Sequence, residues 1–471
     1  MFAASRAGRR RWVALCCAMF LTGSALADAR ETVDVIIAGD FVVTVNPDDE
    51  VIEQGAVAVR DGSIVAVGRE AQITARYQAA RTIPGGQRVL LPGLINGHTH
   101  MAMTLFRGLA DDLRLMEWLN DHMFPAEVAF ADADFVRAGT ALACWEMLRG
   151  GTTTAVDMYY FPNVVAEVIA DCGMRAVVAA TVIGQPSPDA KTPAQALRQA
   201  RAFIEKWRGH PRVVPALGPH AIYTTAPETL LKVRDTAREL HAPLSIHMAE
   251  SRSENTLARD RYGKPTVSLL EEVGFFDQQT RFIAAHMVWP TPQEMATLAR
   301  YGVGAVHNPT SNMKITAGIA PVQALQQAGV AVGLGTDGAA SNNDLDMWEE
   351  MRLATLLAKI SLDDATALPA AQVLRMATID GARAIGMDNQ LGSIEAGKQA
   401  DLIQLSLSGA HMLPLYNVIS HLVYTAKSSD VTTVLVQGVP VVEAGEVTTI
   451  DTDAITSDAQ AYRRRIAERA R

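Results

Sequence analysis

The sequence predicts an α/β fold, a distorted (β/α)₈ TIM barrel joined to a small β-sandwich domain that both terminal segments build. Short apolar runs alternate with amphipathic stretches through the middle of the chain, and strand-like sequence flanks this region on both sides. Such alternation is typical of parallel sheets, and eight units favour closure into a barrel. An open doubly wound sheet is the alternative, but no Gly-x-Gly-x-x-Gly pattern follows any of the runs.

The predicted barrel strands are eight apolar runs without polar alternation, as expected of parallel strands buried on both faces. They are Val89–Ile95, Thr153–Val156, Ala176–Val182, Val213–Leu217, Leu244–Ile246, Phe282–Ala285, Val303–Val306 and Val330–Leu334. Stretches between them, such as Ala194–Trp207 and Leu230–Leu240, have the apolar period of surface helices. We therefore place the barrel at residues 89–391.

Strand-like segments occur near both ends of the chain. They are Val33–Val45, Ala56–Arg60, Ser63–Val67, Ala400–Leu407, Thr432–Val436 and Val439–Val442. The turn residues Asp61 and Gly62 separate two of them, which indicates a hairpin. These segments predict a β-sandwich from residues 28–88 and 392–450, followed by a C-terminal helix at 451–471.

The first 27 residues have the pattern of a cleaved signal peptide. Basic residues precede a short apolar run, Val13–Thr22, and Ala25-Leu26-Ala27 suits a cleavage site before Asp28. We expect a periplasmic or secreted protein, whereas a misassigned start would leave it cytoplasmic. No run reaches the roughly 18 apolar residues of a membrane-spanning helix, so no membrane anchor is expected.

The composition of the whole chain is that of an ordinary globular protein, with 49% hydrophobic and 20% charged residues. A formal net charge of −9 argues against a general nucleic-acid binder, which normally carries a basic face. After removal of the signal peptide only Cys144 and Cys172 remain, and we expect both to be buried small side chains, with a disulfide as the alternative. The oligomeric state is left open, with a homo-oligomer allowed.

Polar side chains follow the predicted strands. His98 and His100 come after the first strand, His220 after the fourth, His247 after the fifth, His286 after the sixth, His307 after the seventh and Asp337 after the eighth. The carboxyl ends of the strands of a parallel barrel open onto one face, where active sites are built. The sequence therefore predicts an active site at this end of the barrel.

Four of these residues suit a metal ion. His98 and His100 are two positions apart, so on a strand both imidazoles project to the same side. With His247 and Asp337 they make three imidazoles and one carboxylate, a set that suits one Zn²⁺ and leaves a place for water. Fe²⁺ or Mn²⁺ would accept the same ligands. Bound zinc lowers the pKa of its water to about 7 and so supplies a hydroxide nucleophile.

Two carboxylates can divide the proton transfers. Asp337 can take the proton from the water, and Glu250, three residues after His247, can pass a proton to the substrate and the leaving group. His286 can hydrogen-bond the hydroxide. His307 precedes a turn-rich loop, and its role is left open.

Longer motifs surround these residues. They are PGLINGHTHMAMTLFRGLADDL, the Trp118–Glu127 segment, LGPHAIY, IHMAE, AAH, HNPTSNMKI and LGTDGAASNNDLDMWEEMR. On these motifs the chain, from about Val33 to Val447, resembles the amidohydrolase superfamily and within it the 5′-methylthioadenosine/S-adenosylhomocysteine deaminases.

The resemblance implies that His98, His100, His247 and Asp337 bind zinc, that Glu250 moves protons to N1 of the purine and that His286 orients the hydroxide. It also implies that Glu127 contacts the ribose hydroxyls and that His220 lies near the sugar. No lysine ends the fourth strand, where dinuclear relatives carry a bridging carboxylated lysine, so one ion is expected.

The expected reaction is hydrolytic deamination of an adenine nucleoside, by attack of metal-bound hydroxide on C6, to ammonia and the inosine analogue. Relatives that accept S-adenosylhomocysteine carry arginines upstream of LGPH; Arg198 and Arg201 occur there, but neither is placed on that pattern, and S-adenosylhomocysteine stays a possible substrate. Methylthioadenosine or adenosine is therefore favoured. The alternatives are a deaminase or chlorohydrolase of a free base or triazine, and a non-catalytic binding protein.

Overall fold

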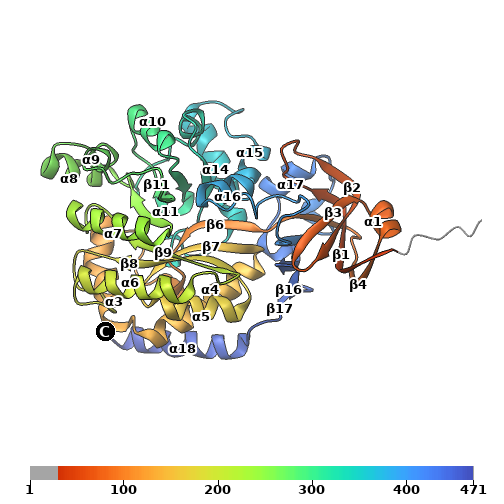
Figure 1. Cartoon of the computed structure of the whole chain (residues 1–471), viewed down its shortest axis with the longest axis horizontal. Helices are drawn as coiled ribbons and strands as arrows, with labels where there is room; N and C mark the ends of the chain where they lie inside the picture. The colour runs from red at the N-terminus through yellow and green to blue at the C-terminus, as the bar shows by residue number, and fades with distance from the viewer. Residues whose placement is uncertain (1–29, 470–471) are drawn as a thin grey trace, which may run out of the picture.

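The computed structural model describes residues 30–469. The predicted signal peptide, residues 1–27, lies outside the described residues. Two domains are visible in Figure 1, a larger one around an eight-stranded sheet and a smaller one around a nine-stranded sheet.

The larger domain is a barrel of eight parallel strands, which confirms the predicted fold class. The strands are β6 (Leu94–Thr99), β7 (Thr152–Tyr159), β8 (Arg175–Val182), β9 (Val213–Pro219), β10 (Leu244–Met248), β11 (Phe282–His286), β12 (Gly304–His307) and β13 (Val332–Leu334). Each pairs in parallel with the next. The ring closes between the first and the last strand, where the backbone N–H of Asp337 donates to the carbonyl of His98 over 2.9 Å.

Helices cover the outside of the barrel (Figure 1). The helices of this domain are α4 (Ala133–Arg149), α5 (Pro162–Cys172), α6 (Pro193–Trp207), α7 (Pro227–Leu240), α8 (Arg252–Tyr262), α9 (Thr266–Glu272), α10 (Pro292–Arg300), α11 (Pro309–Lys314), α12 (Val322–Gln327), α13 (Ala339–Asn342), α14 (Met347–Leu362), α15 (Ala370–Met376) and α16 (Ile379–Ile385). The short α11 and α13 lie at the carboxyl ends of the strands, where they contact Asp337. Local sequence sets several of the helix starts. Helix α10 begins with Pro292 inside a capping box of Thr291 and Glu294, which satisfies its first backbone donors.

The connection from β6 to α4 is the longest excursion at the carboxyl end of the strands. It contains η1 (Met101–Phe106), α2 (Leu115–Glu117), the π-helical segment η2 (Trp118–Met123) and α3 (Phe124–Phe130). Leu115, Trp118 and Met123 are buried against the barrel although they lie in a loop region.

The smaller domain is one mixed sheet, and both ends of the chain contribute to it as predicted. Its strands are β1 (Glu31–Val43), β2 (Val51–Arg60), β3 (Ser63–Arg69), β4 (Tyr77–Ile83), β5 (Arg88–Pro92), β14 (Leu402–Ser406), β15 (Val431–Val436), β16 (Val439–Glu443) and β17 (Glu446–Val447). The shorter helical elements there are α1 (Glu70–Arg76), η3 (Ala410–Met412), α17 (Val418–Tyr424) and η4 (Ser428–Asp430). Successive residues of β1, such as Ile36 and Ile37, are buried in separate apolar clusters on opposite faces of the sheet.

The prediction of a single strand over Val89–Ile95 is wrong. Arg88–Pro92 pairs with β1 and β14 in the terminal sheet, and only Leu94–Thr99 belongs to the barrel. Gly93 joins the two strands, and a Cβ atom there would lie 2.2 Å from the Thr153 hydroxyl. An apolar run gives no sign of a change of sheet, because both halves are equally buried.

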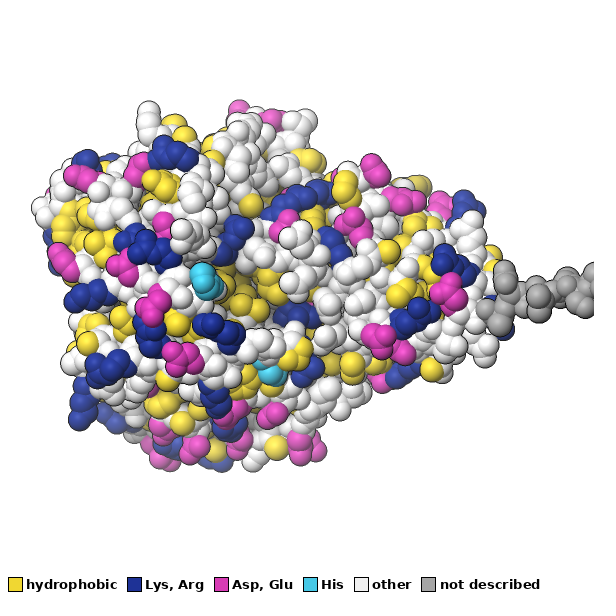
Figure 2. All heavy atoms as spheres, viewed as in Figure 1, with side chains coloured by type: hydrophobic (Ala, Val, Ile, Leu, Met, Phe, Trp, Pro, Cys, Tyr) yellow, Lys and Arg dark blue, Asp and Glu magenta, His cyan; other side chains and the backbone are white. Residues whose placement is uncertain are grey.

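The last helix, α18 (Thr452–Arg469), lies along the side of the barrel beside α4 (Figure 1). The rings of Tyr462 and Phe135 meet edge to face, with centroids 5.3 Å apart. No helix among residues 30–469 is long and apolar enough to cross a membrane. Figure 2 shows acidic and basic side chains interspersed on the face in view, not a continuous basic surface.

Cys144 and Cys172 are paired, which corrects the expectation of two unpaired buried side chains. Their disulfide joins α4 to the end of α5, two helices adjacent in the chain. Both residues are buried. The spacing in the sequence did not reveal the pair, because a single pair of cysteines in helical segments is also compatible with ordinary packing.

A buried ion pair joins the two domains. Arg175, the first residue of β8, donates from Nε and Nη2 to both carboxylate oxygens of Asp401, over 2.9 and 3.2 Å. Asp401 also accepts from the backbone N–H of Gln437. Both charged side chains are almost fully buried, so neither has water to replace its partner.

We expect Asp401→Asn to lower the free energy of unfolding by about 3–5 kcal/mol, because it leaves the Arg175 guanidinium buried without a counter-ion. Glu443→Gln is the control, since Glu443 pairs with Arg81 at the surface of the same domain and should contribute less than about 1 kcal/mol. Urea unfolding measures both. Equal losses in the two variants would contradict a special role of the buried pair.

Candidate active site

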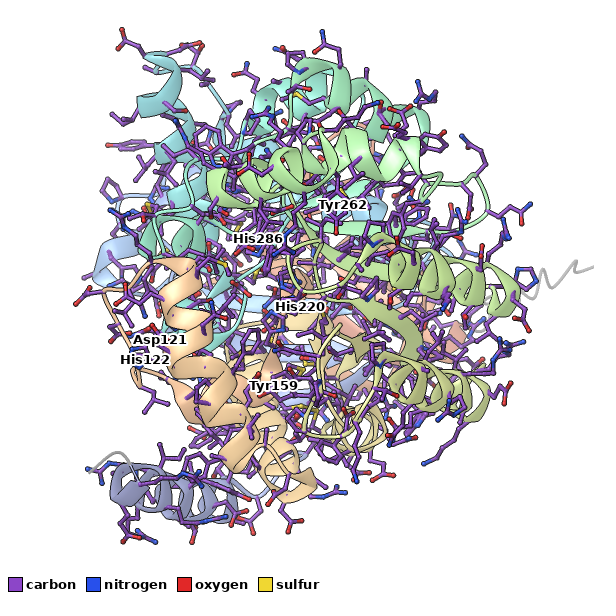
Figure 3. All side chains as sticks on the ribbon, turned by 90° about the vertical axis from the view of Figure 1, so that its left-hand side faces the viewer. Asp121, His122, Tyr159, His220, Tyr262 and His286 are labelled. Carbon is purple, nitrogen blue, oxygen red and sulfur yellow. A yellow bond between two sulfur atoms is a disulfide. The ribbon has the colours of Figure 1, made fainter. Side chains whose placement is uncertain are left out.

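A pocket opens at the carboxyl ends of the barrel strands. Its walls include His100, His220, His247, His286 and Asp337 from the strand ends, and Glu127 from α3. In Figure 3 the labelled His220, His286 and Tyr159 lie toward the middle of the ring of helices. The structure thus gathers in one pocket five of the seven side chains that the sequence predicted for this end of the barrel.

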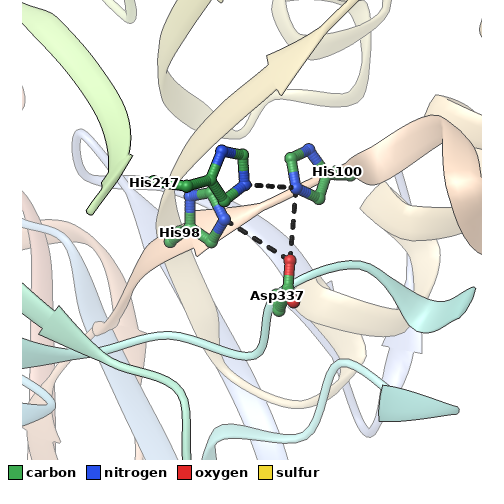
Figure 4. A group of neighbouring side chains, drawn as sticks. All are labelled: His98, His100, His247 and Asp337. Carbon is green, nitrogen blue, oxygen red and sulfur yellow. Dashed lines mark hydrogen bonds and ion pairs between the residues drawn. The ribbon is translucent and has the colours of Figure 1, made fainter. Parts of the chain in front are cut away.

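Four side chains could hold a metal ion at the base of this pocket: His98, His100, His247 and Asp337, whose ligand atoms all lie within 4.8 Å of one another (Figure 4). Asp337 Oδ1 lies 3.4 Å from His98 Nε2 and 3.2 Å from His100 Nε2. The Nε2 atoms of His100 and His247 are 3.2 Å apart.

The hydrogen bonds of these imidazoles fit metal binding. Nδ1 of His100 lies 2.6 Å from the carbonyl of Met158, and Nδ1 of His247 lies 2.8 Å from the carbonyl of His220. A carbonyl only accepts, so both Nδ1 atoms carry the proton and each Nε2 is left with a free lone pair. Two such lone pairs facing each other need a cation or a proton between them.

His98 strengthens this fit. Both of its ring nitrogens are buried and have no hydrogen-bond partner within residues 30–469. Burial lowers the pKa of His98 to about 4 and holds that of His247 well below its ordinary value, so both are neutral at pH 7, the form that binds metal. Against the effect of burial, the Asp337 carboxylate raises the pKa of His100 to about 9, so a metal must displace a proton from this ring. Three imidazoles and one carboxylate then suit Zn²⁺, Fe²⁺ or Mn²⁺.

Glu250 lies just beyond β10 and is fully buried, and each of its two carboxylate oxygens faces a neighbouring side chain. Its Oε2 accepts from the hydroxyl of Tyr223 over 2.9 Å, and its Oε1 lies 3.8 Å from Nε2 of His286. The Glu254 carboxylate accepts from the backbone N–H groups of Ala249 and Glu250. Burial raises the pKa of Glu250, so it keeps a proton at higher pH than an exposed glutamate.

His286 is oriented by the loop after β12. Its Nδ1 lies 2.8 Å from Oδ1 of Asn312, which makes Nδ1 the protonated nitrogen. Nε2 is therefore the atom turned toward Glu250 and the pocket, and it has no hydrogen-bond partner among the described residues. An imidazole in this state can accept a hydrogen bond from water in the pocket.

Glu127 lies on the wall formed by α3. It is buried and accepts from the Tyr160 hydroxyl over 3.2 Å. Burial raises its pKa to about 7, which is unusual for a glutamate near the start of a short helix. His220 lines the same pocket and is held by a contact of 2.9 Å between its Nδ1 and the Thr224 hydroxyl.

His307 does not line this pocket. It is buried, its pKa is lowered to about 3 by burial, and its carbonyl accepts from the N–H of Gly335. Its contacts give no catalytic role.

Three residues at the site have strained backbone conformations. Asp337, His286 and Ala249 have φ values of 61°, 73° and 51°, in the left-handed region that side-chain-bearing residues rarely adopt. Residues persist there only where their surroundings fix them. The sequence predicted roles for Asp337 and His286 but not for Tyr223 and Glu254. The only signal for these two was their closeness in the chain to His220 and Glu250.

A model described as the amidohydrolase family matches residues 89–441. The chain belongs to this family. It is 46% identical over 422 residues to a 5-methylthioadenosine/S-adenosylhomocysteine deaminase of Syntrophobacter fumaroxidans, covering 90% of this chain and 96% of that one. It is 41% identical to a 5′-deoxyadenosine deaminase of Methanosarcina mazei, covering 91% and 97%.

Among solved structures, an adenosine deaminase from Xanthomonas campestris with bound zinc is 42% identical to this amidohydrolase. The superposition has a TM-score of 0.91 and covers 93% of this chain and 100% of the other. The predicted family is thus confirmed, together with the barrel and its appended sheet.

Proposed function

We propose that this amidohydrolase removes the amino group of adenine nucleosides by metal-dependent hydrolysis, yielding ammonia and the inosine analogue. One observation carries the proposal: a single pocket holds the metal-ligand group, the proton carrier Glu250 and, on the facing helix α3, the buried carboxylate of Glu127. The deaminases to which the chain is 40–46% identical support the same chemistry.

We propose zinc as the ion, held by His98, His100, His247 and Asp337. The zinc in the 42% identical adenosine deaminase supports this choice over iron or manganese. When bound, such an ion lowers the pKa of water to about 7 and so supplies a nucleophile at neutral pH.

The side chains then divide the proton transfers. Asp337 accepts a proton from the attacking water, and His286 Nε2 accepts a hydrogen bond that orients it. Glu250, whose raised pKa favours the protonated form, donates its proton to N1 of the purine. It then takes the proton of the hydroxyl group added at C6 and gives it to the amino group, which leaves as ammonia, and the proton on Asp337 restores the protonated Glu250. Tyr223 keeps one Glu250 oxygen occupied, so the other faces His286 and the substrate.

Glu127 is proposed to accept hydrogen bonds from the ribose hydroxyls, with His220 beside the sugar. The ionised carboxylate has acceptors for both hydroxyls, and Tyr160 fixes its orientation. This contact is what separates a nucleoside from a free base or a triazine, since neither carries a ribose.

The pocket wall also constrains the 5′ substituent. Leu115, Trp118, Met123, Phe124 and Ile315 line it, and no lysine or arginine does so among the described residues. Arg198 and Arg201 lie instead along a separate groove between α6 and α7, where Arg201 pairs with Glu239. The charged amino-acid tail of S-adenosylhomocysteine therefore finds no basic partner.

We expect 5′-methylthioadenosine, 5′-deoxyadenosine or adenosine to be deaminated with a kcat/KM at least tenfold above that of S-adenosylhomocysteine, because burying an uncompensated charge is costly. Ammonia release from each nucleoside, with adenine and guanine as free-base controls, measures this. Turnover of a free base above every nucleoside would contradict the nucleoside assignment.

Glu250→Gln should lower kcat by about 10²–10⁴-fold, the usual contribution of a positioned acid–base group, while the metal content stays at the wild-type level. Glu271→Gln is the control, since Glu271 pairs with Arg300 away from the pocket. A variant with wild-type kcat would exclude Glu250 as the proton carrier.

Glu127→Gln should raise KM for the nucleoside by about 10- to 100-fold, as expected for loss of charge-assisted hydrogen bonds. Because the pKa of Glu127 is about 7, its ionised fraction grows as pH rises through 7, so wild-type KM should fall between pH 6 and 8. The variant should lack this dependence. An unchanged KM in Glu127→Gln would contradict ribose recognition.

We propose that the chain is exported to the periplasm or secreted. The signal-like pattern of residues 1–27 and the Cys144–Cys172 disulfide, typical of oxidising compartments, support this. The intact mass of the native protein tests it: a mature chain starting at Asp28 is expected, and an N-terminus at Met1 in the cytoplasm would contradict it.

A further inference from the structure

The two oxygens of the Asp337 carboxylate have different surroundings. Oδ1 faces the imidazoles of His98 and His100. Oδ2 is turned away and accepts from two hydroxyls, that of Ser311 over 2.6 Å and that of Ser341 over 2.9 Å. Asp337, Ser311 and Ser341 are all buried, so the two hydroxyls are the near donors for Oδ2.

The backbone of Asp337 is already fixed. Its N–H donates to the His98 carbonyl, and its own carbonyl accepts from the hydroxyls of Thr99 and Thr336, each over 3.0 Å. What remains free is rotation of the side chain, and the two serine hydroxyls remove that freedom. They do so from different elements, since Ser311 lies on α11 and Ser341 on α13.

A third side chain ties these two short helices together. Glu350 of α14 is fully buried, and its Oε2 accepts from the backbone N–H of Thr310 over 3.1 Å. Its Oε1 accepts from the Asn342 amide over 2.7 Å, and the same amide donates to the carbonyl of Thr336. Glu350 thus links Thr310, which precedes Ser311, to Asn342, which follows Ser341.

We propose that Ser311 and Ser341 are positioning residues that present Oδ1 of Asp337 to the metal, and that Glu350 sets the spacing of the two serines. With Oδ2 occupied by two donors, the carboxylate meets the ion through one defined oxygen. The proposal concerns retention of the metal and is independent of which nucleoside is the substrate. Outer-shell hydrogen bonds of this kind typically change metal affinity by about 10- to 100-fold.

The test is zinc affinity of the apoprotein, measured by competition with a chromophoric chelator. Ser311→Ala and Ser341→Ala should each weaken zinc binding by about tenfold, and the double variant by up to about 100-fold. Glu350→Gln should weaken it in the same direction. In Co²⁺-loaded protein, the d–d absorption bands of the serine variants should shift, because the carboxylate then binds in more than one orientation.

Ser245→Ala is the matched control. Ser245 is buried on β10 two residues from His247, and its hydroxyl has no hydrogen-bond partner among residues 30–469. It should keep wild-type zinc affinity. Thermal unfolding of each apoprotein separates a loss of stability from a loss of positioning. Ser311→Ala and Ser341→Ala binding zinc as tightly as Ser245→Ala, with unchanged Co²⁺ spectra, would overturn the proposal.

Discussion

Three imidazoles and one carboxylate meet inside the barrel with their ligand atoms within 4.8 Å of one another. Without a cation, this is an unfavourable arrangement, because the Nε2 lone pairs of His100 and His247 face each other and both nitrogens of His98 lack partners. A bound cation, or in its absence a proton on His100, supplies the positive charge that this arrangement needs. Most other features of the site either hold these four groups in place or line the pocket above them.

Hydrogen bonds from surrounding groups hold the four candidate metal ligands in place. Backbone carbonyls of Met158 and His220 set the tautomers of two ligands, and hydroxyls of Ser311 and Ser341 orient the carboxylate. The left-handed backbone at Asp337 is kept by two hydrogen bonds with β6, one to the carbonyl of His98 and one from the hydroxyl of Thr99. Rigidity of this kind favours catalysis, since groups held in place need no reorganisation during the reaction.

The sequence predicted the parts of the site that follow from strand ends. Histidines and an aspartate placed after apolar runs indicated both the barrel and its active face, because parallel strands all end on one side. The Arg88–Pro92 strand could not be separated from the barrel, since equal burial leaves no pattern at Gly93. Tyr223, Ser311 and Glu350 carry ordinary side chains at ordinary spacings, and only the fold brings their atoms to Glu250 and Asp337.

We propose that one metal ion in this site makes the protein a nucleoside deaminase. The most direct measurement is stepwise addition of zinc to the apoprotein while ammonia release from 5′-methylthioadenosine is followed. We expect no release without metal, then a linear rise, and saturation at one equivalent of zinc per chain. Activity that is independent of zinc, or a fully loaded protein that releases no ammonia from any adenine nucleoside, would contradict it.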